Sequence, residues 1–294
     1  MVGAGRAATW RDLVASATKR LAAADVEVAD ARQEARWLAE QASGLDVAEL
    51  QLELDRPVPA RASASFDRML DRRLAGEPLQ YALGRWGFRR LDLYVDHRVL
   101  IPRPETEVLA ERALAECDHL GATTVVDLGT GSGALALSLA VERPQLHEIW
   151  ATDVSGDALA VARANLAGLG AAASRVRLAS GSWFAALPEG LRRRIDVVVS
   201  NPPYVADSEM PDLPDEVRDW EPVEALVSGS QGLDAIAEIV ADAPGWLTRP
   251  GALLVEMAPH QTARAERLAR AAGFTSVSVW PDLAGRDRIL CARL

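Results

Sequence analysis

Apolar residues in the first part of the chain recur at the spacing of amphipathic helices. Intervals of three and four residues place such positions on one face of a helix. Gly44 ends the second of these segments, and Pro57 and Pro59 precede the third. The pattern therefore predicts a small helical bundle. Its apolar positions are Trp10, Leu13, Val14, Ala17 and Leu21, then Ala31, Ala35, Leu38, Ala39 and Ala42, and finally Phe66, Met69, Leu70 and Leu74.

Helical spacing gives way to alternation after this bundle. Leu91, Leu93 and Val95 alternate with polar residues, which is typical of a strand or hairpin. A further helix is expected just after Pro104. We therefore predict three parts: a helical domain at 1–82, a β-hairpin linker at 83–102 and an α/β domain at 103–294.

Strand and helix patterns alternate through the rest of the chain. Seven apolar segments predict strands, and helical patterns such as Ala134–Val141 and Ala158–Leu166 lie between them. This alternation predicts an α/β fold with a doubly wound, Rossmann-like sheet of seven mostly parallel strands. The connection Trp280–Asp287 is too short for a helical crossover, so the last two strands should pair antiparallel at one edge. The predicted strands are Thr123–Leu128, Glu148–Thr152, Arg175–Ala179, Ile195–Ser200, Ala252–Glu256, Thr275–Val279 and Arg288–Ala292.

The composition limits the class of function. Apolar residues make up 49% and charged residues 25% of the 294 residues, which is typical of a globular protein. The formal net charge of -10 disfavours stable binding to nucleic acid. Cys117 and Cys291 lie far apart and the histidines lack ligand spacing, so we expect neither disulfides nor a metal site. No secretory signal or membrane-length apolar segment is visible, so we expect a cytoplasmic protein without membrane contacts.

A glycine-rich turn follows the first predicted strand of the α/β domain. It contains Gly129, Thr130, Gly131, Ser132 and Gly133. Glycines allow a tight turn and a close approach of a ligand to the backbone. An acidic residue, Asp153, ends the next strand about twenty positions later, where a carboxylate can accept hydrogen bonds from both hydroxyls of a ribose. This pairing predicts a cofactor with an adenosine portion.

The turn alone does not decide between cofactors, because it also satisfies a loose dinucleotide fingerprint. The negative charge of Asp127 just before the glycines suits the cationic methionine end of S-adenosylmethionine better than a pyrophosphate. The segment Asn201-Pro202-Pro203-Tyr204 at the carboxyl end of the fourth predicted strand favours S-adenosylmethionine more strongly. Ligands of open α/β sheets bind outside these strand ends.

The Asn-Pro-Pro-Tyr segment has the groups needed to methylate a planar nitrogen. The lone pair of such a nitrogen is delocalised, so it is a poor nucleophile. The side-chain oxygen of Asn201 and the backbone carbonyl of Pro202 can accept both N–H bonds and favour the cationic nitrogen that develops during transfer. Proline fixes φ at Pro202 and Pro203, and Tyr204 supplies a flat face against the planar group. All four residues are therefore expected to bind the substrate, and Asn201, Pro202 and Tyr204 are the expected catalytic residues.

The sequence resembles the glutamine-amide methyltransferases that modify class-1 peptide chain release factors. The tetrapeptide alone is shared with DNA-adenine and other amino methyltransferases, whereas the segment Ile101-Pro102-Arg103-Pro104-Glu105-Thr106-Glu107 is far more specific. The resemblance covers most of the chain. Its other residues include Gly76–Tyr81, Gly84, Phe88, Leu91, Leu93, Val95, Val99, Leu100, Asp127–Gly133, Asp153, Ser182–Phe184, Ser200–Tyr204, Glu221, Pro222, Ala225, Leu226, Gly285 and Arg288.

The resemblance implies S-adenosyl-L-methionine as cofactor and the glutamine of the Gly-Gly-Gln loop of release factors as substrate. It implies that Gly129–Gly133 and Asp153 hold the cofactor, and that Trp183 and Asn201 complete its pocket. The segment Pro102–Thr106 is expected near the methionine end and the entrance. A helical N-terminal domain that docks the substrate, a hairpin linker and a seven-stranded catalytic domain are also implied.

The chain departs from the family's pattern at three places. The family often has aspartate at the position of Ser182, so a contact to the adenine amino group can differ. Residues 257–261 replace a segment that usually has glycine after the acidic strand end. The N-terminal bundle matches weakly, for example at Arg32–Leu38.

Three other functions are compatible with parts of the pattern. An amino methyltransferase acting on nucleic acid would need a basic cleft or a target-recognition domain, which the sequence does not show. A nicotinamide-dependent dehydrogenase fits only the glycine turn. A non-catalytic cofactor-binding scaffold is disfavoured because the glycines and Asn201 are all present.

Overall fold

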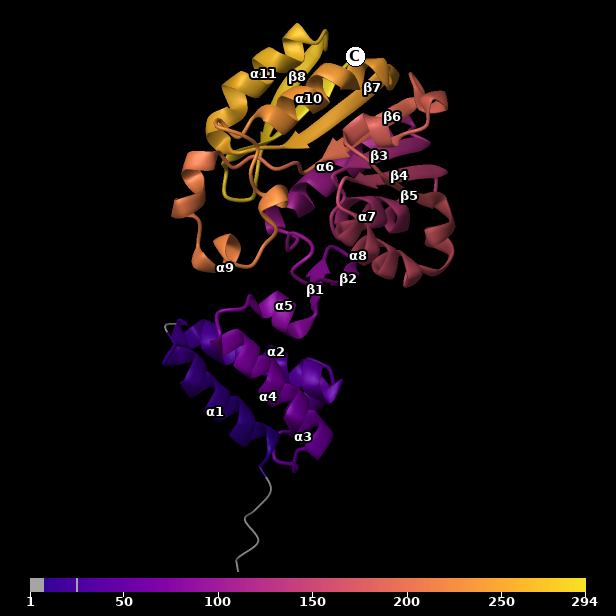
Figure 1. Cartoon of the computed structure of the whole chain (residues 1–294). Helices are drawn as coiled ribbons and strands as arrows, with labels where there is room; N and C mark the ends of the chain where they lie inside the picture. Colours follow the sequence, from indigo (N-terminus) through magenta and orange to yellow (C-terminus); the bar gives the residue numbers. More distant parts are fainter. Residues whose placement is uncertain (1–7, 25) are drawn as a thin grey trace, which may run out of the picture. The chain divides into compact units, whose positions relative to one another are not determined.

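The computed structural model describes residues 8–24 and 26–294 (Figure 1). These residues divide into two compact units, one that ends at Gly84 and one that spans Arg85–Leu294. Within the described residues, no helix is long and apolar enough to cross a membrane.

The first unit is the predicted helical bundle. The side chain of Thr9 accepts a hydrogen bond from the backbone of Asp12, whose carboxylate accepts one from the backbone of Thr9; this reciprocal capping starts the first helix. Two of the helices are too short for hydrophobic periodicity to reveal, and they were not predicted. The helices are α1 (Trp10–Ala22), α2 (Val28–Ser43), α3 (Val47–Glu53), α4 (Ala60–Leu74) and α5 (Leu79–Leu83).

The second unit begins with an antiparallel hairpin of β1 (Arg85–Phe88) and β2 (Leu91–Tyr94). A seven-stranded sheet follows in the order β5-β4-β3-β6-β7-β9-β8. Strands β3 to β7 are parallel, and β9 pairs antiparallel with both β7 and β8. The predicted fold class and the antiparallel edge pair are thus confirmed. The strands are β3 (Thr124–Leu128), β4 (Glu148–Asp153), β5 (Val176–Ser180), β6 (Ile195–Ser200), β7 (Leu247–Glu256), β8 (Ser276–Pro281) and β9 (Asp287–Arg293).

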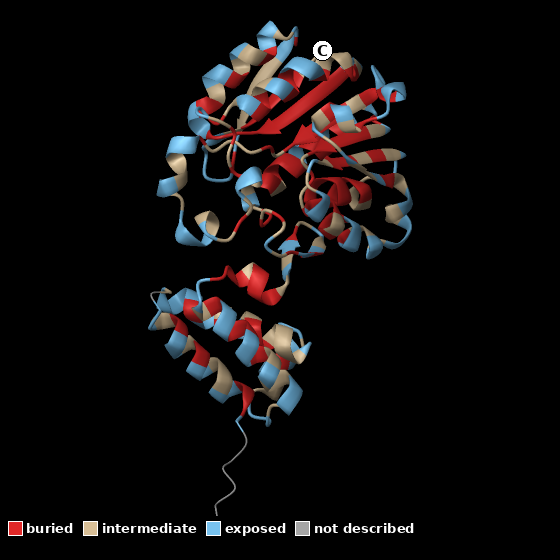
Figure 2. Ribbon diagram, in the orientation of Figure 1, coloured by how far each residue is buried: buried red, intermediate tan, exposed pale blue. Residues whose placement is uncertain are grey.

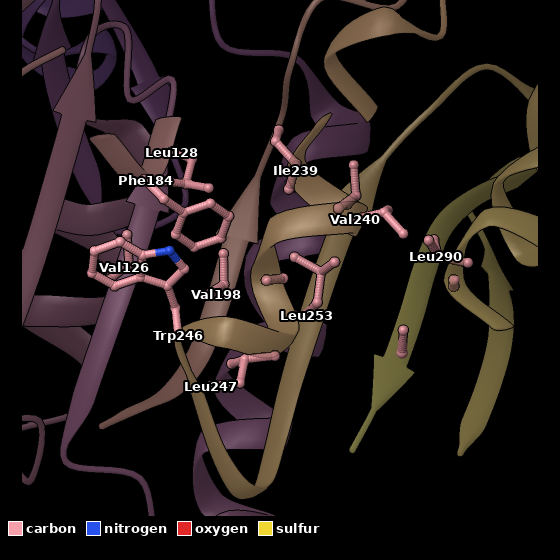
Figure 3. Close-up of a cluster of buried hydrophobic side chains, with 14 of the residues drawn as sticks. Val126, Leu128, Phe184, Val198, Ile239, Val240, Trp246, Leu247, Leu253 and Leu290 are labelled. Carbon is pink, nitrogen blue, oxygen red and sulfur yellow. The ribbon is translucent and has the colours of Figure 1, made fainter. Parts of the chain in front are cut away.

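Helices cover both faces of this sheet, and most residues of its central strands are buried (Figure 2). Because side chains alternate along a strand, Val126, Val198 and Leu253 point to one face and their neighbours to the other. On the first face they pack with α10 and α11 in one apolar cluster (Figure 3). The helices of this unit are α6 (Pro104–Leu120), α7 (Ala134–Glu142), α8 (Gly156–Ala167), α9 (Asp215–Arg218), α10 (Asp234–Asp242) and α11 (Thr262–Ala271).

Two stacked aromatic rings form part of this cluster. Phe184 and Trp246 stack with ring centroids 5.6 Å apart and an interplanar angle of 14° (Figure 3). Such a pair stabilises the fold by roughly 0.5–1.5 kcal/mol beyond its buried area. Because Phe184 follows Trp183 in the chain, its burial fixes the segment that carries the predicted cofactor residue.

The strand order creates a crevice at the carboxyl ends of β3, β4 and β6. From β3 the chain continues to β4 on one side, whereas β6 pairs with β3 on the other side. Connecting segments diverge at such a reversal, and ligands of doubly wound sheets bind there. The glycine turn, Asp153 and Asn201 follow or end these three strands.

Candidate active site

A cavity of about 650 Å³ opens at the carboxyl ends of these strands. Its volume lies within the range usual for small-molecule and cofactor sites. Eight of the predicted site residues line it, which means that the strand ends bring together residues far apart in the chain. These eight are Gly129, Thr130, Gly131, Ser132, Asp153, Trp183, Asn201 and Pro203.

The glycine turn and Asp153 form one continuous part of the cavity wall. One carboxylate oxygen of Asp153 accepts a hydrogen bond from the backbone of Gly131 at 2.9 Å, and the other accepts one from Ser155 at 2.9 Å. The backbone N–H of Thr130 donates to the carbonyl of Thr152 at 2.8 Å. These bonds hold the turn against the end of β4. Burial raises the pKa of Asp153 from 3.8, although both backbone hydrogen bonds oppose that shift.

The indole of Trp183 lies beside the first glycine of the turn. Gly129 has φ of +71°, and a Cβ at this position would lie 3.3 Å from Cζ3 of the indole. A side chain would therefore be strained by its backbone and crowded by the ring. The indole N–H of Trp183 donates to Glu238 at 3.2 Å, which holds the ring in place.

Asn201 lies at the end of β6, where the strand is tied to the glycine turn. The hydroxyl of Ser200 donates to the carbonyl of Leu128 at 2.7 Å, so the residues just before Asn201 and Gly129 are bonded directly. The side-chain Nδ2 of Asn201 donates to Thr106 Oγ1 at 3.0 Å. With its nitrogen bound in this way, the Asn201 side chain has its oxygen left to accept a hydrogen bond.

Thr106, the hydrogen-bond partner of Asn201, also contacts a buried carboxylate. Glu256, which ends β7, is 1% exposed. Its Oε2 accepts a hydrogen bond from Thr106 at 2.8 Å, and its Oε1 accepts one from the hydroxyl of Tyr204 at 3.3 Å. Burial is the largest influence and raises the pKa of Glu256 from 4.5 to about 7, against the hydrogen bonds and the charge of Arg288.

The backbone of Tyr204 is fixed by a glutamine from the segment after β7. Nε2 of Gln261 donates to the carbonyl of Tyr204 at 2.8 Å and to that of Gly232 at 2.9 Å. The guanidinium of Arg288 lies 5.9 Å from the centre of the Tyr204 ring. Burial also raises the pKa of Tyr204. The tyrosine is therefore held at its carbonyl, its ring and its hydroxyl.

Three predicted residues do not line this cavity. Gly133 caps the start of α7 with φ of +88°, and Pro202 is buried. Tyr204 packs against the apolar cluster of the sheet. The positions of these residues do not by themselves assign them roles.

The structure does not support the expectation that Asp127 faces the methionine end of a cofactor. The side chain is completely buried, and the residue does not contribute to the cavity wall. Its Oδ2 accepts hydrogen bonds from the hydroxyl of Thr130 at 2.6 Å and the backbone of Ala136 at 3.1 Å. Burial raises the pKa of Asp127 to about 7. The carboxylate therefore shapes the glycine turn from within the core.

Sequence reasoning overlooked several residues that contribute to the site. Thr106 was expected only as part of a segment near the methionine end and the entrance, and Glu256 and Gln261 received no role. The position of Glu256 near Asn201 follows from the sheet topology, because β6 and β7 are parallel neighbours and Ser200 pairs with Val255. Residues that follow paired positions lie at the same edge of the sheet. Gln261 had no comparable signal, because its contacts depend on the path of a loop.

Models of known protein families match residues in both units of the chain. The PrmC N-terminal domain matches residues 12–84, and the methyltransferase small domain matches residues 105–214. A release factor glutamine methyltransferase of Cereibacter sphaeroides is 46% identical over 286 residues, which cover 96% of this chain and 98% of that protein. The chain belongs to the release factor glutamine methyltransferase family.

A second relative has a similar identity and coverage. The release factor glutamine methyltransferase of Moorella thermoacetica is 43% identical over 286 residues, covering 97% of this chain and 98% of that protein. As a member of the release factor glutamine methyltransferase family, the protein is a methyltransferase, and the family implies a methyl-donor cofactor.

Solved structures support the fold independently. The catalytic domain of hMettl16, solved with an RNA hairpin of the MAT2A 3′UTR, aligns with a TM-score of 0.56 over 78% of this chain and 79% of that chain. Its sequence identity is 16%, so the comparison shows a shared methyltransferase fold and nothing about substrate.

Proposed function

We propose that the protein transfers a methyl group from S-adenosyl-L-methionine to the side-chain amide nitrogen of the glutamine in the Gly-Gly-Gln motif of class-1 peptide chain release factors. The observation that carries this proposal is the placement of Asn201 in one cavity with the glycine turn and Asp153. Family membership supplies the class of substrate. Because release factors act on ribosomes, the proposed location is the cytoplasm.

The residues of the cavity fit S-adenosyl-L-methionine. Gly129 and Gly131 keep backbone atoms accessible where a Cβ would narrow the space or strain the turn. We assign the ribose hydroxyls to Asp153, the cofactor backbone to Gly129–Gly133, and the adenine to the wall containing Ser182 and Trp183. When bound, the cofactor supplies an electrophilic methyl group on a cationic sulfur.

Asn201 and the carbonyl of Pro202 act on the nitrogen that receives the methyl group. Each accepts a hydrogen bond from one N–H group of the substrate glutamine. Together they orient the amide nitrogen of that glutamine toward the methyl group. On transfer of the methyl group, the N–C bond would form as the C–S bond breaks, and the nitrogen would become cationic. The two acceptors then bind its hydrogens more strongly than before, which lowers the barrier. The nitrogen subsequently loses one proton to water, so no base is needed before transfer.

Pro203 and Tyr204 complete the proposed substrate site. Proline limits the backbone freedom of the loop, which keeps the Pro202 carbonyl aimed at little entropic cost. The ring of Tyr204, held through its hydroxyl by Glu256, provides a flat apolar surface for the planar amide. We further propose that the helical unit at residues 1–82 docks the release factor, that residues 83–102 serve as its linker, and that residues 103–294 carry the chemistry.

The charge near the cavity disfavours the alternative of a nucleic-acid substrate. Glu224 lines the cavity, and the segment that leads to it is strongly acidic. A phosphate backbone approaching this segment would be repelled. The carboxylates between positions 207 and 224 belong to Asp207, Glu209, Asp212, Asp215, Glu216, Asp219, Glu221 and Glu224.

Asp153→Ala is expected to weaken binding of S-adenosyl-L-methionine by roughly 1.5–3 kcal/mol, because charge-assisted hydrogen bonds to the ribose are lost. Part of this effect will come from the turn, since Asp153 also accepts from Gly131. Asp153→Asn keeps one acceptor and is the matched control, with an intermediate loss. Calorimetric titration measures the affinity of the wild type and of each variant for S-adenosyl-L-methionine and for nicotinamide dinucleotides. Tight nicotinamide binding, or an Ala variant with wild-type affinity, would contradict the assignment.

Substrate class is tested by incubating the enzyme with labelled cofactor and either a release factor, duplex DNA or naked RNA. We expect label only on the glutamine of the Gly-Gly-Gln motif, located by mass spectrometry. Low salt is the fair condition because it favours binding to phosphates most. A release factor whose motif glutamine is replaced by glutamate is the control and should stay unlabelled. Label on nucleic acid without label on the release factor would overturn the proposed function.

A further inference from the structure

A directional chain of hydrogen bonds links the buried Glu256 to the cavity. Asn201 Nδ2 donates to Thr106 Oγ1 at 3.0 Å, and Thr106 Oγ1 is 2.8 Å from Glu256 Oε2. A hydroxyl has one hydrogen, and an ionised carboxylate can only accept. The hydrogen of Thr106 must therefore point to Glu256, which leaves Thr106 able only to accept from Asn201. The ionised carboxylate sets the direction of both bonds.

This direction decides which end of the Asn201 amide a ligand meets. The amide has a donor nitrogen on one side and an acceptor oxygen on the other. Its nitrogen is bound to Thr106, so its oxygen is the end left for the substrate. We propose, on the basis of the methyl transfer proposed above, that Thr106 and Glu256 are positioning residues that keep the acceptor end of Asn201 toward the substrate nitrogen.

Burial and connectivity support a role for Glu256 beyond packing. The side chain ends a central strand yet does not line the cavity, so it can reach a ligand only through other residues. Its two oxygens accept from Thr106 and Tyr204. One carboxylate thus holds both hydrogen-bonding side chains of the Asn-Pro-Pro-Tyr segment, Asn201 through Thr106 and Tyr204 directly. A carboxylate buried for packing alone would be costly, because a charge removed from water without partners is unfavourable.

Protonation of Glu256 would reverse the direction of the hydrogen bonds that link Glu256, Thr106 and Asn201. The groups that face it are Thr106 and Glu105 from α6, Tyr204 from the loop after β6, and Arg288 from β9. Together with burial, they leave its pKa at about 7. A protonated Glu256 can donate to Thr106, which then turns its hydrogen to Asn201. The amide of Asn201 would rotate to accept that bond and would present its nitrogen to the cavity. Methyl transfer should therefore fall as the pH falls below about 7.

The first test compares Thr106→Val with Thr106→Ser in single-turnover methyl transfer with saturating cofactor and release factor. Valine has a similar shape but no hydroxyl, so transfer should slow by about 10–100-fold because Asn201 is no longer oriented. Serine keeps the hydroxyl and should remain within about threefold of the wild type. Thr248→Val removes a hydroxyl from the opposite end of β7 and controls for a general loss of stability. Affinity for the demethylated cofactor should change less than about threefold in each variant.

Glu256→Gln separates positioning from a structural role. Glutamine can accept from Thr106 or donate to it, so both directions of the chain become available, and transfer at pH 8 should slow by about 3–10-fold. The same change removes a buried charge whose pKa is raised, so the melting temperature at pH 8 should rise by roughly 3–8 °C. A structural role alone would lower stability and activity together.

The pH profile is the decisive measurement. The wild type should lose activity below about pH 7, whereas the Thr106→Val and Glu256→Gln profiles should lack that step. Asp127 also has a pKa of about 7, and a step caused by Asp127 would persist in both variants. A persisting step, or wild-type transfer by Thr106→Val, would overturn the positioning role. Absence of label on the release factor with wild-type enzyme would instead refute the proposed function, so the two failures are distinguishable.

Discussion

Asn201→Ala is expected to slow methyl transfer to the release factor by about 10²–10³-fold, comparable to the loss of one pre-aimed hydrogen-bonding group in other enzymes. The substitution removes one of the two acceptors that stabilise the cationic amide nitrogen. Cofactor affinity should change much less, because the glycine turn and Asp153 remain in place. Single-turnover measurement with saturating cofactor and release factor reports the chemical step directly.

Asn201→Asp is the informative comparison. Acceptor geometry alone would favour more activity in this variant than in Asn201→Ala, because aspartate keeps an acceptor of similar size. The added negative charge acts in the opposite direction, because it carries a desolvation cost. The contacts of Thr106 decide between these two effects. Thr106 has one hydrogen to share between the introduced aspartate and Glu256, so two carboxylates would compete for it in a buried site. We therefore expect Asn201→Asp to be no faster than Asn201→Ala. Transfer by Asn201→Ala at the wild-type rate would show that the Asn-Pro-Pro-Tyr loop lacks the assigned role.

The fold was predictable because the apolar patterns and the lengths of the connections indicate the same arrangement of strands and helices. Short apolar segments between helical patterns predicted all seven strands of the sheet, and the short connection before β9 predicted its antiparallel edge. The observed strands begin or end within a few residues of the predictions, except that β7 begins at Leu247 and not at Ala252. Its first half contains Pro250 and Gly251, which break the apolar pattern of a strand.

The lining of the site was predictable where function depends on strand ends and backbone freedom. Gly129, Asp153 and Asn201 follow or end neighbouring strands, so the topology of the sheet brings them together. Asp127 was assigned the wrong surroundings because a strand pattern gives the face of a residue but not the depth at which the turn covers it. Thr106 and Glu256 could not be paired from sequence, since hydrogen-bond direction depends on atomic positions.

The backbone of Gly232 lies close to the backbone of the Asn-Pro-Pro-Tyr loop. Gly232 has φ of +66°, and a Cβ there would lie 2.2 Å from the carbonyl oxygen of Tyr204 and 2.7 Å from Nε2 of Gln261. The first of these atoms belongs to the backbone and cannot move alone. Because Gln261 donates to both Tyr204 and Gly232, a displacement at any of the three residues would shift the other two.

Gly232→Ala is therefore expected to lower the free energy of unfolding by about 3–5 kcal/mol and to slow methyl transfer by more than about tenfold, the effect of a small misplacement of reacting groups. Gly170→Ala is the matched control, because Gly170 has φ of +58° but open space around its Cβ position. It should lose only about 1–2 kcal/mol, from the left-handed backbone alone. Denaturant unfolding gives the stabilities, and single-turnover transfer at a temperature where both variants are folded gives the rates. If Gly232→Ala matched Gly170→Ala in both measurements, the contact between Gly232 and Tyr204 would not position the loop, and the clash would be relieved without moving the residues that bind the substrate.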